Sequence, residues 1–274
     1  MKKKLLIMII SIIVLPFCCG CDKDSQNNLL EDKLILNENL KSEDENTLDE
    51  IEDAKVNKEE NKKQQNEEYI ICIDPGHQIK GDMSQEPVGP GSSETKFKVS
   101  WGTQGVLTNT PEYELNLQAS KKLKSKLEEL GFTVIMTRQT NDVSISNSER
   151  AIFANENNAD LVIRIHADGS EDSSVNGASL LIPSHNGQYT KDIYAESNKC
   201  AKLIYDEMIN SKFKVNDIYE RSDLTGFNWS KVPVVLVEMG FMSNPEEDKK
   251  MSDESYQQNM MNSIAMGIQL YFNK

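Results

Sequence analysis

The chain has 274 residues, of which 38% are hydrophobic and 27% are charged. This is enough for one hydrophobic core of roughly 200 residues with further segments outside it, and it excludes collagen-like, coiled-coil and multi-pass membrane proteins. The 44 acidic residues outnumber the 30 lysines and arginines, which gives a net charge of −14. Nucleic-acid binding needs clustered positive charge, so nucleic acid is excluded as a partner.

Residues 1–20 resemble an export signal. Three lysines at residues 2–4 precede an apolar run at residues 5–17. That run is shorter than the ~20 residues of a membrane-spanning helix and has the length of a signal-peptide core. We therefore expect the protein to be exported to the cell envelope.

The end of this segment is similar to a lipobox, the site at which bacterial lipoproteins are cleaved and lipidated. Gly20 stands directly before Cys21, which would become the lipid-bearing first residue and hold the protein on the outer face of the cytoplasmic membrane. Cys18 occupies a position where lipoboxes usually carry Leu or Val. Ordinary cleavage and an uncleaved anchor therefore stay open as alternatives.

Residues 21–68 form a compositionally distinct segment. It holds 16 acidic residues against 7 lysines. From residue 22 onward it has no glycine, proline or aromatic residue. Such a sequence buries too little apolar surface to offset the entropy lost on ordering, so we predict an acidic, disordered tether. Of the five cysteines only Cys72 and Cys200 lie beyond it, which is no disulfide framework, and Cys72 is expected to be a small buried hydrophobe.

From residue 69 the pattern becomes that of a folded domain. Short apolar runs predict strands at 69–74, 133–137, 161–166, 177–183 and 232–239. Apolar residues at helical spacing predict helices at 115–130, from Ser146 with a capping box to Glu149, and at 195–209 and 256–271. Alternating strands and helices predict a single α/β domain over 69–274, with three layers, in which helices cover both faces of a largely parallel, twisted sheet.

Three of these predicted strands end in residues that suit metal binding or catalysis. His77 follows the first strand in the sequence Asp-Pro-Gly-His, His166 ends the strand at 161–166, and Glu238 ends the strand at 232–239. Ligands of open α/β sheets bind beyond the carboxyl ends of the strands. Two histidines and one carboxylate form a known catalytic zinc set, and a second carboxylate is then needed for proton transfer, a role that Glu238 fits.

Four segments in this order are similar to the signature blocks of the zinc-dependent N-acetylmuramoyl-L-alanine amidases, the autolysin-type family called Amidase_3. They are IDPGH at 73–77, EYELN at 112–116, IRIHAD at 163–168 and VPVVLVEMGFMSNPEED at 232–248. The resemblance spans about residues 69–272. It implies that His77, Glu112 and His166 bind Zn²⁺ and that Glu238 is the catalytic carboxylate.

Glu114 competes with Glu112 for the third ligand position. The family glutamate stands four residues before an asparagine, and Asn116 therefore selects Glu112. Arg164 and Asp168 depart from the family, whose members commonly show Ser and Asn around the second histidine.

The resemblance implies hydrolysis of the amide bond between N-acetylmuramic acid and L-alanine in peptidoglycan. A catalytically silent, zinc-stabilised module that binds peptidoglycan or a partner stays open, as does a zinc peptidase that cuts within stem peptides. The implied partners are the peptidoglycan substrate and the membrane, the latter through the N-terminal lipid or anchor. A need for an activating protein stays open.

Residues 78–111 are long for a simple connection, and long loops in compact domains are usually functional or mobile. We expect this segment to border the substrate groove, where Trp101 would either stack on a sugar face or anchor its own loop. Ser243 and Asn244 are expected to shape a turn and helix cap, and His185 to be exposed, whereas Arg138 and Arg150 have no assigned role.

Overall fold

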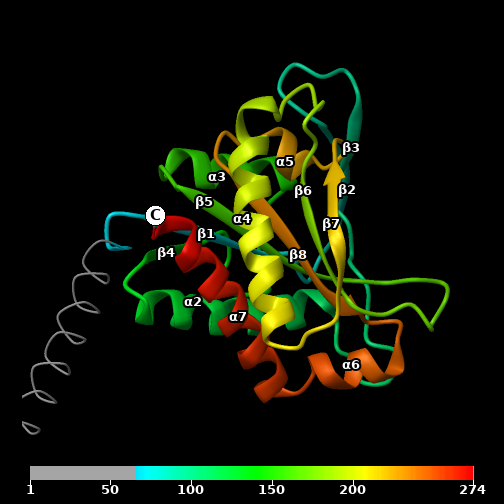
Figure 1. Ribbon diagram of the computed structural model, residues 1–274. Helices are drawn as coiled ribbons and strands as arrows, with labels where there is room; N and C mark the ends of the chain where they lie inside the picture. Colours follow the sequence, from blue (N-terminus) through cyan, green and yellow to red (C-terminus); the bar gives the residue numbers. More distant parts are fainter. Residues whose placement is uncertain (1–65, 274) are drawn as a thin grey trace, which may run out of the picture. The chain divides into compact units, whose positions relative to one another are not determined.

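The structure is a computed structural model that describes residues 66–273 (Figure 1). The strands are β1 Ile70–Pro75, β2 Asp82–Pro87, β3 Thr95–Val99, β4 Thr133–Met136, β5 Leu161–Asp168, β6 Ala178–Pro183, β7 Val215–Arg221 and β8 Val234–Phe241. The helices are α2 Glu112–Glu129, α3 Asn147–Glu156, α4 Lys191–Asn210, α5 Thr225–Asn228, α6 Pro245–Met251 and α7 Glu254–Phe272.

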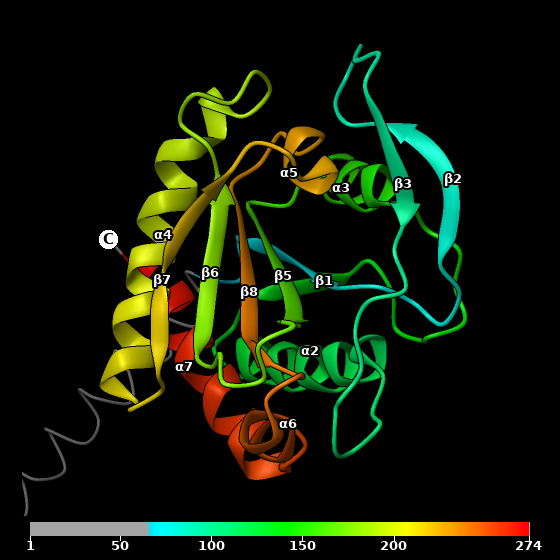
Figure 2. The ribbon, with the colours of Figure 1, turned by 90° about the vertical axis from the view of Figure 1, so that its right-hand side faces the viewer.

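Six strands form one sheet in the order β4-β1-β5-β8-β6-β7. All neighbouring pairs are parallel except β6 with β8. Helices α2, α4 and α7 pack on one face, and α3 and α5 lie on the other, as Figure 2 shows. The prediction of a three-layer α/β domain with a largely parallel sheet is confirmed.

Alternation along each strand divides the core into two layers. On β1, Ile71 and Ile73 face α2, α4 and α7, whereas Cys72 faces the α3 side. On that second face the alternation gives way to polar side chains as each strand approaches its carboxyl end. In register, Asp74 of β1 lies beside Arg164 of β5, and His166 of β5 lies beside Glu238 of β8. The register thereby places charged side chains next to one another near the carboxyl ends of β1, β5 and β8.

The predicted central strands and the four long helices are present within a few residues of their expected ends. Ser146 and Glu149 form the capping box at α3, and Gly131, with φ of 94°, follows the end of α2. The structure adds elements that were not expected: the short helices α5 and α6, the edge strand β7, and the antiparallel pair β2–β3 within the long connection. Strands β2, β3 and β7 are polar and mostly exposed, so they lack the apolar runs on which strand prediction depends.

Cys72 and Cys200 are buried free thiols, so the expected burial of Cys72 is confirmed. The predicted signal at residues 1–20 and nearly all of the predicted tether lie outside the described residues. Asn66, at the end of that predicted tether, is buried, and its amide donates to the carbonyl of Leu130 at 2.8 Å. Within residues 66–273, no helix combines the length and the apolar character needed to cross a membrane.

Helices α4 and α7 approach each other closely at Gly267. A Cβ atom built there would lie 2.5 Å from the Cα of Ile204. Alanine normally stabilises a helix over glycine by about 1 kcal/mol, but here the added methyl meets backbone that has no room to move. We expect Gly267→Ala to lower the free energy of unfolding by about 1–3 kcal/mol in urea titrations. Met266→Ala, an exposed position on the same helix, is the control, and a stabilised Gly267→Ala would contradict this packing.

Candidate metal centre

His77, Glu112 and His166 converge at the carboxyl edge of the sheet, although they are far apart in the chain. Their potential ligand atoms all lie within 4.8 Å of one another. Glu112 Oε1 lies 3.2 Å from His77 Nε2 and 3.2 Å from His166 Nδ1. The structure therefore brings together all three residues that the sequence singled out as metal ligands.

The backbone and a carbonyl group fix the orientation of His77. Its φ of 58° is a conformation that residues other than glycine rarely adopt. Its Nδ1 lies 3.0 Å from the carbonyl oxygen of Ser100, an acceptor for an Nδ1–H proton. Such a bond sets the tautomer and leaves Nε2 free to face Glu112.

Glu112 begins helix α2 and is almost fully buried. Its Oε2 accepts from the backbone N–H of Thr103 at 2.9 Å, and Oε1 accepts from the Asn116 side chain at 3.0 Å. These bonds and the two nearby imidazoles hold the pKa of Glu112 well below its usual range, against the opposing effect of burial. Glu114 is exposed and bonds to Gln118, so of the two glutamates it is Glu112 that lies with the two histidines.

One ring nitrogen of His166 is free to bind a metal ion. Its Nε2 is buried and has no hydrogen-bond partner among the described residues. Burial lowers the pKa of His166 to about 4, so the ring is neutral at physiological pH, as a metal ligand must be. A Cβ atom on Gly76 would lie 2.2 Å from the His166 ring, and one on Gly102 would lie 2.8 Å from Glu112 Oε2. This neutral nitrogen, the anionic carboxylate and the glycine-lined space fit a divalent cation such as Zn²⁺.

Glu238 shares a cleft of about 680 Å³ with the triad. Its Oε2 is buried without a hydrogen-bond partner among residues 66–273. Burial, followed by the charges of Glu112 and Asp168, raises the pKa of Glu238 well above its usual value. A carboxylate with a raised pKa beside an open reaction space is suited to take up and release protons.

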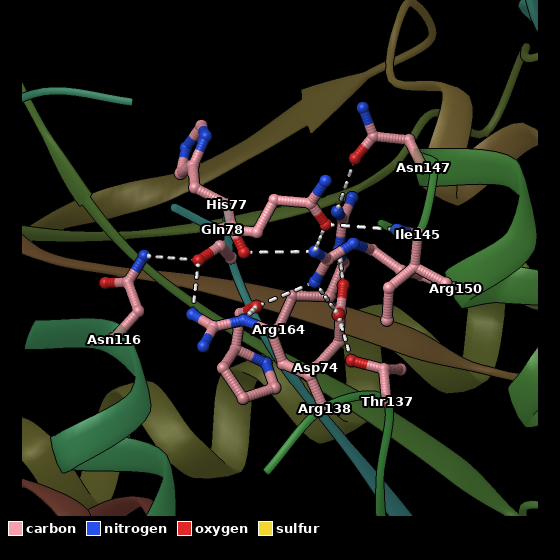
Figure 3. Close-up of polar contacts among 12 residues, drawn as sticks. Asp74, His77, Gln78, Asn116, Thr137, Arg138, Ile145, Asn147, Arg150 and Arg164 are labelled. Atoms are coloured by element: carbon pink, nitrogen blue, oxygen red, sulfur yellow. Dashed lines mark hydrogen bonds and ion pairs between the residues drawn. The ribbon is translucent and has the colours of Figure 1, made fainter. Parts of the chain in front are cut away.

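Two buried arginines hold the loop that carries His77, a role that the sequence did not reveal. Arg138 donates to the carbonyls of Pro75 and Gly76, each at 2.9 Å. Arg150 donates to the carbonyls of Pro75 at 2.8 Å and His77 at 3.0 Å. Three successive carbonyls are thus fixed by guanidinium groups (Figure 3). Their only signal in the sequence was charge at positions 138 and 150, which an exposed arginine would give equally.

Asp74 neutralises part of this cationic cluster. Its carboxylate accepts from Arg150 and Arg164, each at 2.8 Å, and from the Thr137 hydroxyl at 2.6 Å (Figure 3). The two guanidinium charges keep the pKa of Asp74 far below its usual range despite burial. Arg164, one of the two departures from the family pattern, therefore lies beneath the site and not in the cleft. Asp168, the other departure, is exposed and lines the cleft.

The structure also places the other residues that the sequence analysis named. Trp101 lines the cleft and is 58% exposed. The Asn244 side chain caps α6 by accepting from the backbone N–H groups of Glu246 and Glu247, which confirms its expected role. Ser243 Oγ accepts from the N–H of Ser170 in the turn beside the cleft. His185 is exposed and pairs with Glu220 at 2.6 Å.

Comparison with known proteins assigns the family. The family model for N-acetylmuramoyl-L-alanine amidase matches residues 71–270. This match spans most of the chain and all four segments that carried the resemblance. The protein therefore belongs to the N-acetylmuramoyl-L-alanine amidase family of enzymes, as the sequence predicted.

Individual relatives agree with this assignment. The N-acetylmuramoyl-L-alanine amidase Rv3717 of Mycobacterium tuberculosis is 29% identical over 212 residues, which cover 73% of this chain and 84% of that protein. The probable cell wall amidase LytH of Staphylococcus aureus is 28% identical over 74% of this chain, but the match spans only 58% of LytH. The crystal structure of the amidase Ami1 of Mycobacterium smegmatis superimposes with a TM-score of 0.69 at 27% identity, covering 76% of this chain and 98% of Ami1.

The Asp74 cluster gives a stability prediction. We expect Asp74→Asn to lower the free energy of unfolding by about 3–5 kcal/mol at pH 7, because it leaves buried arginine charges without a counterion. The folded-state pKa of Asp74 is depressed, so its contribution is complete above the unfolded pKa of about 3.9 and is lost as the pH falls below it.

Urea titrations of both proteins at several pH values measure this. The difference between them should stay constant from pH 7 to pH 5 and shrink below about pH 4. Asp142→Asn, at an exposed position, is the matched control. A pH-independent difference would show that the Asp74 charge does not stabilise the fold.

Proposed function

We propose that the protein is a zinc-dependent amidase that hydrolyses the bond between N-acetylmuramic acid and the L-alanine of the peptide stem in peptidoglycan. The observation that carries the proposal is the convergence of His77, Glu112 and His166 beside Glu238 in one cleft. Family membership supports the substrate.

In this proposal His77, Glu112 and His166 hold Zn²⁺. A zinc ion bound there supplies Lewis acidity, which polarises the scissile carbonyl and acidifies water. The contact from His77 Nδ1 to the Ser100 carbonyl keeps Nε2 available, and the Asn116 and Thr103 donors hold the Glu112 carboxylate in place.

Glu238 performs the proton transfers. Its carboxylate accepts a proton from the attacking water, and the resulting acid donates that proton to the departing alanine nitrogen. The raised pKa of Glu238 supports both steps, because the group binds the proton firmly and then releases it to a more basic amine. This placement favours turnover over a silent binding module.

We also propose that the enzyme acts in the cell envelope. The cell-wall amidases among its relatives support this location. A lipid on Cys21, or an uncleaved N-terminal anchor, would hold the catalytic domain near the outer face of the cytoplasmic membrane, and residues 21–68 would act as the tether. These features of the N-terminus are interpretations of the sequence.

Product analysis tests the proposed reaction. After incubation of purified peptidoglycan with the zinc-loaded protein, mass spectrometry should detect complete stem peptides with a free N-terminal L-alanine. A zinc peptidase would release shortened stems, and a silent module would release none. Glu238→Gln should bind one equivalent of zinc by elemental analysis yet lose turnover by about 100-fold or more. Retained release of L-alanine amino groups by that variant would overturn the role of Glu238.

The exposed ring of Trp101 gives a further prediction. It lies over Gly81, where an added Cβ would be 2.9 Å from the ring, and it forms part of the cleft wall. If the ring stacks on a sugar of the substrate, Trp101→Ala should raise KM roughly fivefold, which corresponds to about 1 kcal/mol. Phe97→Ala, an exposed aromatic outside the cleft, is the control. An unchanged KM for Trp101→Ala would argue against the contact.

A further inference from the structure

Among the elements of residues 66–273, no helix packs on the second face of the sheet at β7. Parallel strands are usually buried on both sides. Here α5 packs on β6, and the helix that packs on β7 is α4, which lies on the opposite face (Figure 2). The second face of β7 and the adjoining residues of β6 line a hollow of about 980 Å³, which we call the strand cleft.

The strand cleft is continuous with the metal centre. Both are lined by Asp168 and Glu238, so the proposed catalytic carboxylate stands at the junction. Ser179 of β6 is in register with Glu238. Pro183, four residues further along β6, is in register with Arg221 of β7. Four strand residues span roughly 13 Å, which is also the length of about four residues of an extended peptide.

The side chains of the strand cleft are those of a ligand surface. Leu181 pairs with Tyr219 across β6 and β7; Leu181 is buried, and Tyr219 is 46% exposed. The exposed tyrosine offers apolar contact area and a hydroxyl group to a ligand.

Charged groups lie at both ends of the cleft. Its inner end carries the acids Glu238 and Asp168, and its outer end carries Arg221 and also Glu220, whose carboxylate accepts from the Ser184 hydroxyl and the His185 N–H. Arg221 donates to Asp223 through Nε and Nη2, at 2.7 and 2.9 Å, and Lys96 also binds Asp223. Two cations share one carboxylate, so the group retains a net charge of +1. Nη1 of Arg221 has no hydrogen-bond partner within residues 66–273 and is available for an anion.

We propose that the strand cleft binds the peptide stem of the substrate and that Arg221 pairs with a carboxylate of that stem. This inference rests on the proposed amidase function. The scissile amide joins a sugar, which is uncharged once its lactyl group is in amide linkage, to a peptide that bears free carboxylates. The end of the groove that carries the Arg221 guanidinium therefore suits the peptide, and the Trp101 end suits the sugar.

Arg221 is a specificity-determining residue in this arrangement. Lys214 also lines the strand cleft, but its ammonium group donates to Asn176 at the other wall. A guanidinium that offers a planar donor edge matches a carboxylate better than an ammonium does. The enzyme should therefore distinguish stems whose carboxylates are free from stems in which they are converted to carboxamides.

The test compares two soluble muramyl-peptide substrates that differ only in this respect. The zinc-loaded wild-type protein should cleave the free-acid substrate with a kcat/KM about tenfold or more above that of the carboxamide substrate. Arg221→Gln should bring this ratio close to one, and Arg221→Lys should give an intermediate ratio. Lys202→Gln, which removes one positive charge from exposed α4 on the opposite face, should keep the wild-type ratio.

The outcomes separate the two proposals. A wild-type ratio near one, or an Arg221→Gln ratio equal to that of the wild type, overturns the role of Arg221 while the amidase function stands. Failure of the wild-type protein to cleave either substrate overturns the amidase function itself. Because the readout is a ratio measured on one preparation, a partly unfolded Arg221→Gln sample still gives a decisive result.

Discussion

The buried carboxylate of Asp74 is the interaction on which the site depends. It lies between Arg150 and Arg164 at the carboxyl end of β1. Arg150, together with Arg138, in turn fixes the carbonyls of the loop that ends at His77. His77 adopts a positive φ that costs free energy on its own, and this rigid set of charge-assisted hydrogen bonds offsets the cost. The buried arginines and Asp74 therefore fix the backbone from which the His77 side chain extends into the cleft.

Glu112 and Glu238 line the same cleft but have different surroundings. Glu112 accepts several hydrogen bonds and has a depressed pKa, whereas Glu238 is buried with one oxygen unpartnered and has a raised pKa. The surroundings of the two carboxylates thus shift their pKa values in opposite directions. Arg164 and Arg221 act on Glu238 in the other direction, which keeps its ionised form accessible.

The sequence predicted the architecture and the triad well, because each depends on a local pattern. Buried parallel strands are short apolar runs, and polar residues that interrupt them at their carboxyl ends, such as His166 and Glu238, are conspicuous. The arginine network was not predictable, since a single sequence does not distinguish a buried Arg138 from an exposed one. Strand β7 was missed for a related reason: as an edge strand with one open face, it carries polar residues where a central strand would be apolar.

Strand β7, which the sequence did not predict, carries the Arg221 side chain that lines the strand cleft. Edge strands are usually protected by charge, and Arg221 with Asp223 and Lys96 supplies such charge at the end of β7. An exposed lysine anywhere on the edge strand would be enough to prevent pairing with another chain. Arg221 instead lines the cleft that begins at Glu238, and the acids at the inner end contribute to the raised pKa of its guanidinium, after the larger effect of its bonds to Asp223. Arg221, an edge residue that interacts electrostatically with the proposed catalytic carboxylate, is therefore positioned to contact the peptide stem that we propose binds between them.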